Sequence, residues 1–203
     1  MNRVLHNLLI FLALSILSSC STGRHSFSRI EQMYEARERG KNCFVQFADG
    51  RFKQYRSLEL VRALGQAPHL LADNNTRIYP DEVLCYQNAD HYAISSQGFL
   101  IGGHLSKISS ETLPGFAVRI MKGKLNVYVK KYKNGARILD EFYFQQGNRR
   151  EVLVYTPELM DALIKNMPEA LEFYNAYRKH LPKNRDLIAT AYIFNQTYMA
   201  SRK

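Results

Sequence analysis

The sequence lacks an apolar run long enough to cross a bilayer as a helix. Its longest apolar stretch covers residues 8–17 and is interrupted only by Ser15, whereas a membrane-spanning helix needs about 20 apolar residues. Internal repeats and low-complexity segments are also missing. The sequence therefore excludes a spanning helix in this stretch and a repeat architecture.

The motifs of metal-dependent and nucleophilic enzymes are also missing. The G-x-S-x-G turn and the glycine loop that cradles a phosphate are both absent. Adjacent Asp81 and Glu82 would point to opposite faces of a strand, so they do not form a glycosidase pair. No zinc-site spacing occurs among the histidines beyond residue 19, so we expect no metal and no cofactor. These histidines are His25, His69, His91, His104 and His180.

The N-terminus has the features of an export signal. Arg3 supplies a positive charge, the apolar run 8–17 follows, and the small residues Ser18 and Ser19 precede Cys20. A basic start, a short apolar segment and a small-residue exit are typical of a secretory signal rather than of a membrane anchor.

The residues Leu17-Ser18-Ser19-Cys20 resemble the lipobox of bacterial lipoprotein precursors. The resemblance covers the signal segment only. It implies that Cys20 is acylated and becomes the new N-terminus and, because Ser21 is not aspartate, that the protein is sorted to the outer membrane. Each buried acyl CH₂ contributes about 0.8 kcal/mol, so several chains anchor a protein stably. The alternatives are an ordinary cleaved signal that ends in a cysteine by chance, and an uncleaved hydrophobic tail.

The chain then divides into three predicted parts: a signal peptide over residues 1–19, a lipidated cysteine with a polar tether over 20–27, and one globular domain over 28–203. Removing residues 1–19 leaves 184 of the 203 residues, enough to enclose one core. The net charge of +10 favours anionic partners, such as lipid headgroups or acidic glycans. The export signal places the domain away from nucleic acid, which we therefore exclude.

Cysteine is scarce, with only Cys43 and Cys85 beside Cys20. An exported protein can form disulfides, so a bridge between Cys43 and Cys85 is one alternative. The other is a pair of buried thiols that act as small hydrophobic side chains. Neither cysteine lies in a motif that lowers the pKa of a thiol, which argues against a catalytic role.

The hydrophobic pattern predicts an α+β fold, mainly an antiparallel meander of about eight short strands that forms a sheet or a partly open barrel. Ser28 and Glu31 have the spacing of a capping box, which predicts a short helix over 29–39. Asp49-Gly50 joins the two arms of a predicted hairpin. The arms cover 43–47 and 51–55, further strands are expected at 77–79, 83–87, 91–95 and 99–101, and 56–75 has no clear pattern.

Residues 116–155 show the clearest alternation, with four predicted strands and one buried face. Phe116, Val118 and Ile120 begin this apolar face, and the turns between strands contain glycine or asparagine. After Thr156 the period becomes helical, with Thr156 as N-cap and Pro157 in the first turn. Two to three C-terminal helices are expected, beginning near residues 157, 168 and 184.

The opposite face of this meander is predicted to be basic and rich in tyrosine. Nine basic and two acidic residues lie between Arg119 and Arg150. Such a face can bind an anionic glycan or lipid headgroups through charge and ring stacking, or it can be a solvated face whose lysines protect sheet edges. The predicted binding residues are Arg119, Lys124, Tyr128, Lys130, Tyr132 and Arg137.

Two hypotheses for function follow. The first is a non-enzymatic, lipid-tethered envelope domain that binds a protein partner, lipid headgroups or a glycan through the basic face. The second is an envelope hydrolase near Asp90, His91 and His104, with Cys85 as nucleophile and a histidine as base. Sequence order does not show whether these residues meet, and turn histidines that bond to the backbone are the alternative.

Overall fold

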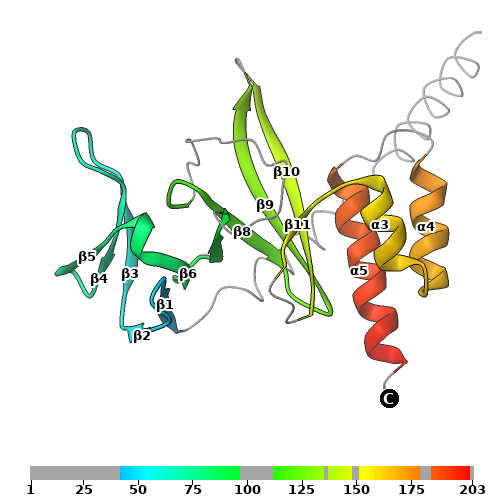
Figure 1. Cartoon of the computed structure of the whole chain (residues 1–203), viewed down its shortest axis with the longest axis horizontal. Coiled ribbons are helices and arrows are strands. Elements are labelled where there is room, and N and C mark those ends of the chain that lie inside the picture. Colours follow the sequence, from blue (N-terminus) through cyan, green and yellow to red (C-terminus); the bar gives the residue numbers. More distant parts are fainter. Residues whose placement is uncertain (1–41, 97–111, 135–136, 148–150, 179–183, 202–203) are drawn as a thin grey trace, which may run out of the picture. The chain divides into compact units, whose positions relative to one another are not determined.

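The computed structural model describes residues 42–96, 112–134, 137–147, 151–178 and 184–201. Residues 37–203 group into one compact unit. Among the described elements, the strands come first and the α-helices after them (Figure 1). The described elements are β1 (Cys43–Phe47), β2 (Phe52–Tyr55), β3 (Leu58–Val61), β4 (His69–Ala72), β5 (Thr76–Ile78), a 3-10 turn (Pro80–Glu82), β6 (Val83–Gln87), β7 (Tyr92–Ser95), β8 (Phe116–Met121), β9 (Leu125–Asn134), β10 (Arg137–Gln146), β11 (Leu153–Val154), α3 (Pro157–Ile164), α4 (Pro168–Arg178) and α5 (Asn184–Ala200).

Within the described residues, eight strands form one antiparallel sheet in the order β11-β10-β9-β8-β7-β6-β1-β2. Strands β3, β4 and β5 form a separate antiparallel sheet. Strands β2 and β11 are the two edges of the large sheet, so the described strands form an open sheet. A mainly antiparallel sheet followed by three C-terminal helices in the described chain confirms the predicted α+β class.

Several predicted elements match closely, and others do not. The hairpin β1–β2 and strand β6 lie where the sequence predicts them. The stretch 56–75, which has no clear pattern in the sequence, contains β3 and β4. The predicted helix over 29–39 and strand over 99–101 lie outside the described residues.

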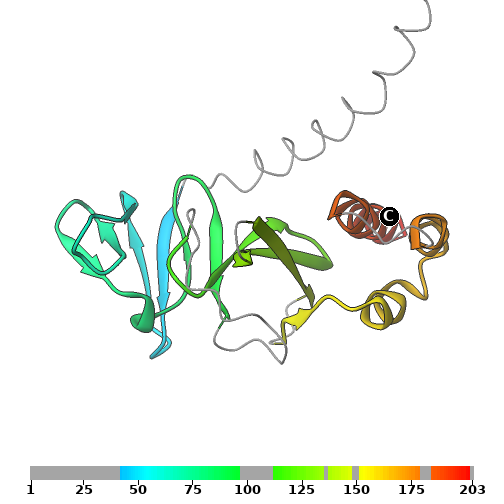
Figure 2. The same ribbon diagram turned by 90° about the horizontal axis from the view of Figure 1, so that it is seen from above.

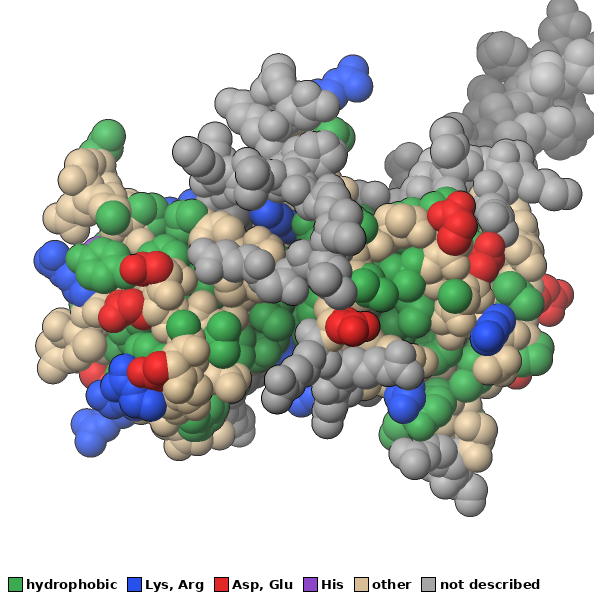
Figure 3. All heavy atoms as spheres, viewed as in Figure 1, with side chains coloured by type: hydrophobic (Ala, Val, Ile, Leu, Met, Phe, Trp, Pro, Cys, Tyr) green, Lys and Arg blue, Asp and Glu red, His purple; other side chains and the backbone are tan. Residues whose placement is uncertain are grey.

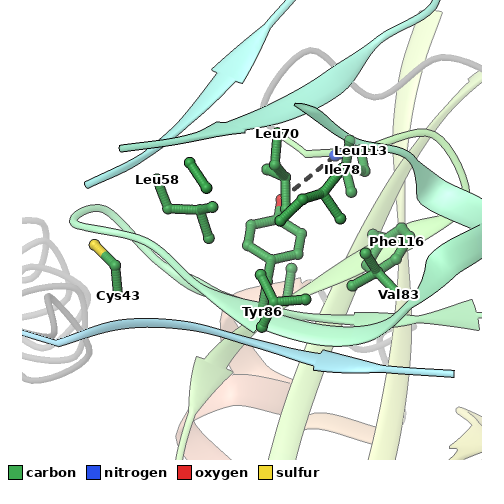
Figure 4. Packing of buried hydrophobic residues seen from close by; sticks show 11 residues of the cluster. Cys43, Leu58, Leu70, Ile78, Val83, Tyr86, Leu113 and Phe116 are labelled. Atoms are coloured by element: carbon green, nitrogen blue, oxygen red, sulfur yellow. Dashed lines mark hydrogen bonds between the residues drawn. The ribbon is translucent and has the colours of Figure 1, made fainter. Parts of the chain in front are cut away.

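The first core lies between β1, β6 and β7 of the large sheet and the small sheet β3–β5. Val45, Leu70 and Tyr86 are fully buried there, and full burial of such a side chain contributes about 1.5–3 kcal/mol. Figure 4 shows the ring of Tyr86 pointing among the apolar side chains of the small sheet. The small sheet therefore covers one face of the large sheet at this end, as Figure 2 shows from a second direction.

The second packing region lies between the β8–β10 meander and the C-terminal helices. Met121, Leu125 and Val127 are fully buried, and α5 contacts β9. The predicted apolar residue Ile120 is only half-buried, because a register shift between Arg119 and Met121 places Met121 opposite Val127 instead. The alternation predicted from the sequence is thus broken by one bulge.

Asn195 of α5 connects these two layers through its side chain. Its Oδ1 accepts the Leu125 N–H at 2.8 Å, and its Nδ2 donates to the Leu125 carbonyl at 2.9 Å. The amide therefore satisfies both backbone groups of a buried strand residue, as a neighbouring strand would. The nearby Gly123 leaves room for it, since a Cβ there would lie 2.5 Å from both terminal atoms of the Asn195 side chain.

Candidate functional site

The residues of the predicted basic face share one face of the meander at its centre. Tyr128 of β9 is paired with Arg119 of β8 and with Tyr143 of β10. Directly opposed residues of antiparallel strands have their side chains on the same face. Lys130 lies two residues beyond Tyr128 and therefore shares this face.

The centre of this face is buried, contrary to the exposure that a binding face requires. Tyr128 and Tyr143 are each 1% exposed, Lys130 is 6% exposed and Asn126 is 8% exposed. Ala117 and Val152 belong to the same buried cluster as the two tyrosines. The meander thus has two covered faces, and the expectation of one open polar face is wrong at its centre.

Hydrogen bonds within the chain satisfy the polar groups of this buried face. The Tyr128 hydroxyl donates to Gln145 Oε1 at 2.7 Å, and Asn126 Nδ2 donates to the same oxygen at 3.1 Å. The Tyr143 hydroxyl donates to Glu141 Oε2 at 2.5 Å. Burial raises the pKa of Tyr143, and the Glu141 carboxylate raises it further. These contacts explain how tyrosines remain buried with their hydroxyls paired.

The two cations at the centre of the face also have partners inside the fold. The Arg119 guanidinium lies over the Tyr92 ring, 3.8 Å from its centroid. Lys130 Nζ donates to Ser96 Oγ at 3.4 Å, and Glu141 is its cross-strand neighbour. Desolvation lowers the pKa of Lys130, while the Glu141 carboxylate acts in the opposite direction. Both cations are therefore engaged by groups of the same chain, with Lys130 buried and Arg119 half-buried.

The remaining predicted residues lie far apart. Lys124 precedes β9, where its Nζ lies 5.1 Å from the centroid of the Tyr198 ring. Arg137 begins β10 and pairs with Asn134 at the other end of the hairpin. Ten residues of strand separate the two ends, a distance of about 30 Å. Lys124 and Arg137 therefore do not belong to one compact site, and the side chain of Tyr132 lies outside the described part.

The distal part of the β9–β10 hairpin extends beyond its neighbouring strands. Among the described residues, β8 pairs with β9 only from Val127 to Val129, and β11 pairs with β10 only at Tyr143 and Phe144. The hairpin itself remains paired from Gln146 to Arg137. Figure 1 shows β9 and β10 running past their neighbours toward the turn. We call residues 131–140 the distal ribbon. Among its described side chains, Arg137 and Asp140 are exposed and Leu139 is 36% exposed.

The two cysteines are free and buried, so the disulfide alternative is not realised. Cys43 and Val45 lie on one face of β1, and Val45 is paired with Tyr86. Cys85 precedes Tyr86 and therefore lies on the opposite face, where its thiol donates to Gln46 Oε1 at 3.4 Å. Side chains on opposite faces of a sheet cannot form a bridge. The sequence could not show this, because strand register was unknown.

The alternation of side chains along β6 also separates Cys85, the proposed nucleophile, from His91, its proposed base. His91 Nε2 lies 3.1 Å from the hydroxyl of Tyr86, whose side chain is on the face opposite that of Cys85. Burial also raises the pKa of the Cys85 thiol, which disfavours the thiolate that catalysis requires. The backbone N–H groups of Asp90 and His91 both donate to Asn88 Oδ1, which fixes a turn. A Cys85–His91 pair is therefore wrong, and His104 lies outside the described residues.

In the part of the chain that the structure describes, no cluster of three His, Cys, Asp or Glu side chains could hold a metal ion. None of the described helices has the length and apolar character that crossing a membrane requires. Comparisons with protein-family models, with curated proteins and with solved structures found no match to this chain.

Proposed function

We propose that the protein is a lipid-anchored protein of the bacterial cell envelope, attached through acylated Cys20 and sorted to the outer membrane. The observation that carries this proposal is the sequence Leu17-Ser18-Ser19-Cys20 after a short apolar run. Mass spectrometry of protein from its native host is expected to find an N-terminus at Cys20 that carries fatty acid. A chain that still begins at Met1, or a mature end without lipid, contradicts the anchor.

We further propose that the folded domain is a binding or structural module rather than an enzyme. Support comes from the separation of Cys85 and His91, and from the internal pairing of the central cations Arg119 and Lys130. These side chains contact other groups of the same chain, which leaves little of the predicted basic face for a substrate. We therefore expect the binding residues in a part of the chain that extends beyond the packed strands.

The distal ribbon is the part that best fits an anionic envelope surface. Its lysines are not equivalent, because Lys131 has Asp140 as cross-strand neighbour, and opposite charges at such positions interact. Lys133 and Arg137 have no carboxylate as cross-strand neighbour, since their partners are Ile138 and Asn134. The register therefore places neither residue opposite a carboxylate, and a cation near an anionic membrane surface contributes about 1 kcal/mol.

The test compares vesicle binding by a version that begins at Ser21, so that the lipid anchor makes no contribution. Reversing both Lys133 and Arg137 to glutamate is expected to weaken binding to phosphatidylserine vesicles at low salt by more than tenfold, because about 2 kcal/mol or more of attraction is lost. Lys165→Glu is the matched control, since Lys165 is an exposed cation at the end of α3.

Unchanged retention of the double variant contradicts the role of the ribbon, and so does an equal loss in the Lys165→Glu control. Circular dichroism of each variant checks that the fold is kept. A soluble acidic glycan in a second series separates the two anionic partners. If glycan binds and vesicles do not, the lipid headgroup is not the ligand.

A further inference from the structure

In the described part of the chain, strand β2 presents a hydrogen-bonding edge of the large sheet that no strand occupies. In the hairpin, the Phe47 N–H donates to the Arg51 carbonyl at 2.8 Å, and Gly50, with φ of +88°, completes the turn. Hydrogen-bonded and non-hydrogen-bonded pairs alternate along an antiparallel ladder. From this start, the next bonded pair is Val45 with Lys53. The N–H and C=O groups of Phe52 and Gln54 therefore point away from β1.

No other strand pairs with β2 among the described residues, and β2 is the last strand in the order of the sheet. Three of its four residues are exposed, and Phe52 is 58% exposed. The Phe52 ring lies 4.9 Å from that of Phe44, so it extends an aromatic surface of β1 to the edge. The other edge of the sheet, β11, has only two residues. Strand β2 is thus the edge with room for an added strand.

Strand β2 itself carries one cation, Lys53, and no acidic residue. Arg51 forms an ion pair with Asp49 at 2.6 Å, whereas no salt bridge to Lys53 or Arg56 occurs in the described ranges. The Asp73 carboxylate, at the end of the strand, accepts the backbone N–H groups of Arg56 and its neighbour at 2.7 and 3.0 Å, and its negative charge acts on Tyr55. Figure 3 shows basic and acidic side chains gathered at this end of the molecule.

The two faces of the edge have different chemistry, because side chains alternate along a strand. Phe52 and Gln54 lie on one face, next to the Phe44 ring. Lys53 lies on the other, with its Nζ 5.0 Å from the centroid of the Tyr55 ring. An added strand would place its alternate residues beside an aromatic surface and beside a cation.

We propose that β2 binds an extended, acidic peptide segment of a partner protein, which adds a strand to the large sheet. Backbone groups of Phe52 and Gln54 supply the hydrogen bonds, and alternating apolar and acidic side chains of the partner face Phe52 and Lys53. A second copy of this chain fits poorly, because the same cations would meet across the new pair. The inference depends neither on the lipid anchor nor on the distal ribbon.

The experiment uses the full chain in detergent and a labelled synthetic peptide of alternating valine and glutamate, with fluorescence anisotropy as readout. Saturable binding is expected, with new hydrogen-exchange protection at Phe52 and Gln54. Gln54→Pro removes one outward N–H without removing a bond to β1, and it is expected to weaken binding about tenfold. Lys53→Glu is expected to weaken binding of this peptide and to favour its valine–lysine counterpart. Arg77→Glu, at an exposed position on the edge strand β5, is the matched control and is expected to bind as the unaltered protein does.

Three results would overturn the proposal. The first is equal binding of the valine–glutamate peptide and a scrambled peptide of the same composition. The second is that Lys53→Glu keeps its preference for the valine–glutamate peptide over the valine–lysine peptide, which would show that the charge at position 53 does not determine which peptide binds. The third is a dimer in which the β2 edges protect one another without peptide. Hydrogen exchange in β1 of each variant distinguishes lost binding from a lost hairpin.

Discussion

The amide of Asn195 offers the sharpest test of how the helices stabilise the meander. The side chain is 7% exposed, and it satisfies both backbone groups of Leu125, which is fully buried. Each net hydrogen bond contributes about 0.5–1.5 kcal/mol, and a buried polar group left unpaired costs about 1–3 kcal/mol. Asn195→Ala is therefore expected to lower the free energy of unfolding by about 2–4 kcal/mol.

The measurement is chemical denaturation of the full chain, followed by circular dichroism. Asn175→Ala is the matched control, because Asn175 is exposed on α4, and we expect a change within about 0.5 kcal/mol. Asn195→Asp keeps the side-chain volume but places a carboxylate against the Leu125 carbonyl, so it is expected to cost at least as much as Asn195→Ala. A loss below about 1 kcal/mol in both Asn195 variants would refute the reasoning, since it would mean that water replaces the amide at no cost.

Two further predictions concern the same core and the buried tyrosines. Gly123→Ala is expected to destabilise the protein by about 1–3 kcal/mol through overpacking against Asn195, and by less in the Asn195→Ala background; additive losses in a double-mutant cycle would contradict this. Burial raises the pKa values of Tyr86, Tyr92 and Tyr143, whereas unfolded tyrosine ionises near pH 10. The unfolded chain then binds fewer protons above about pH 10, so stability is expected to fall as the pH rises further. Tyrosinate absorbance is expected to rise at the same pH at which the circular dichroism signal is lost. Ionisation of these tyrosines near pH 10 while the protein is still folded would contradict this prediction.

The elements that the sequence predicts correctly have signals contained in a few neighbouring residues. The Asp49-Gly50 turn needs a residue that tolerates positive φ, and Gly50 has φ of +88°. Helix α3 begins where Thr156 accepts the Leu159 N–H at 3.1 Å. By contrast, the strand character of Leu58 and Leu70 depends on packing against β1 and β6, which a local pattern does not contain.

The candidate site was less predictable than the fold. Alternation correctly places Tyr128 and Tyr143 on the face opposite the apolar residues, but it does not show that both faces are covered. The sequence alternation is the same for a buried tyrosine as for an exposed one, because a tyrosine can be buried when its hydroxyl has a hydrogen-bond partner inside the protein. The positions of Cys85 and His91 depend on register, which is set by pairing between strands that are distant in the sequence.

The sequence by itself determined the α+β class, the turns, the three C-terminal helices of the described chain and the prediction of a lipid anchor at Cys20, because these features depend on short-range patterns and local chemistry. The tertiary structure alone decided which faces are buried, which cations are paired and which strands form the edges of the described sheet. Those outcomes depend on contacts between residues far apart along the chain. Lys130 and Lys53 are the same residue type in strands, yet one is 6% exposed among its partners and the other lies exposed at an edge.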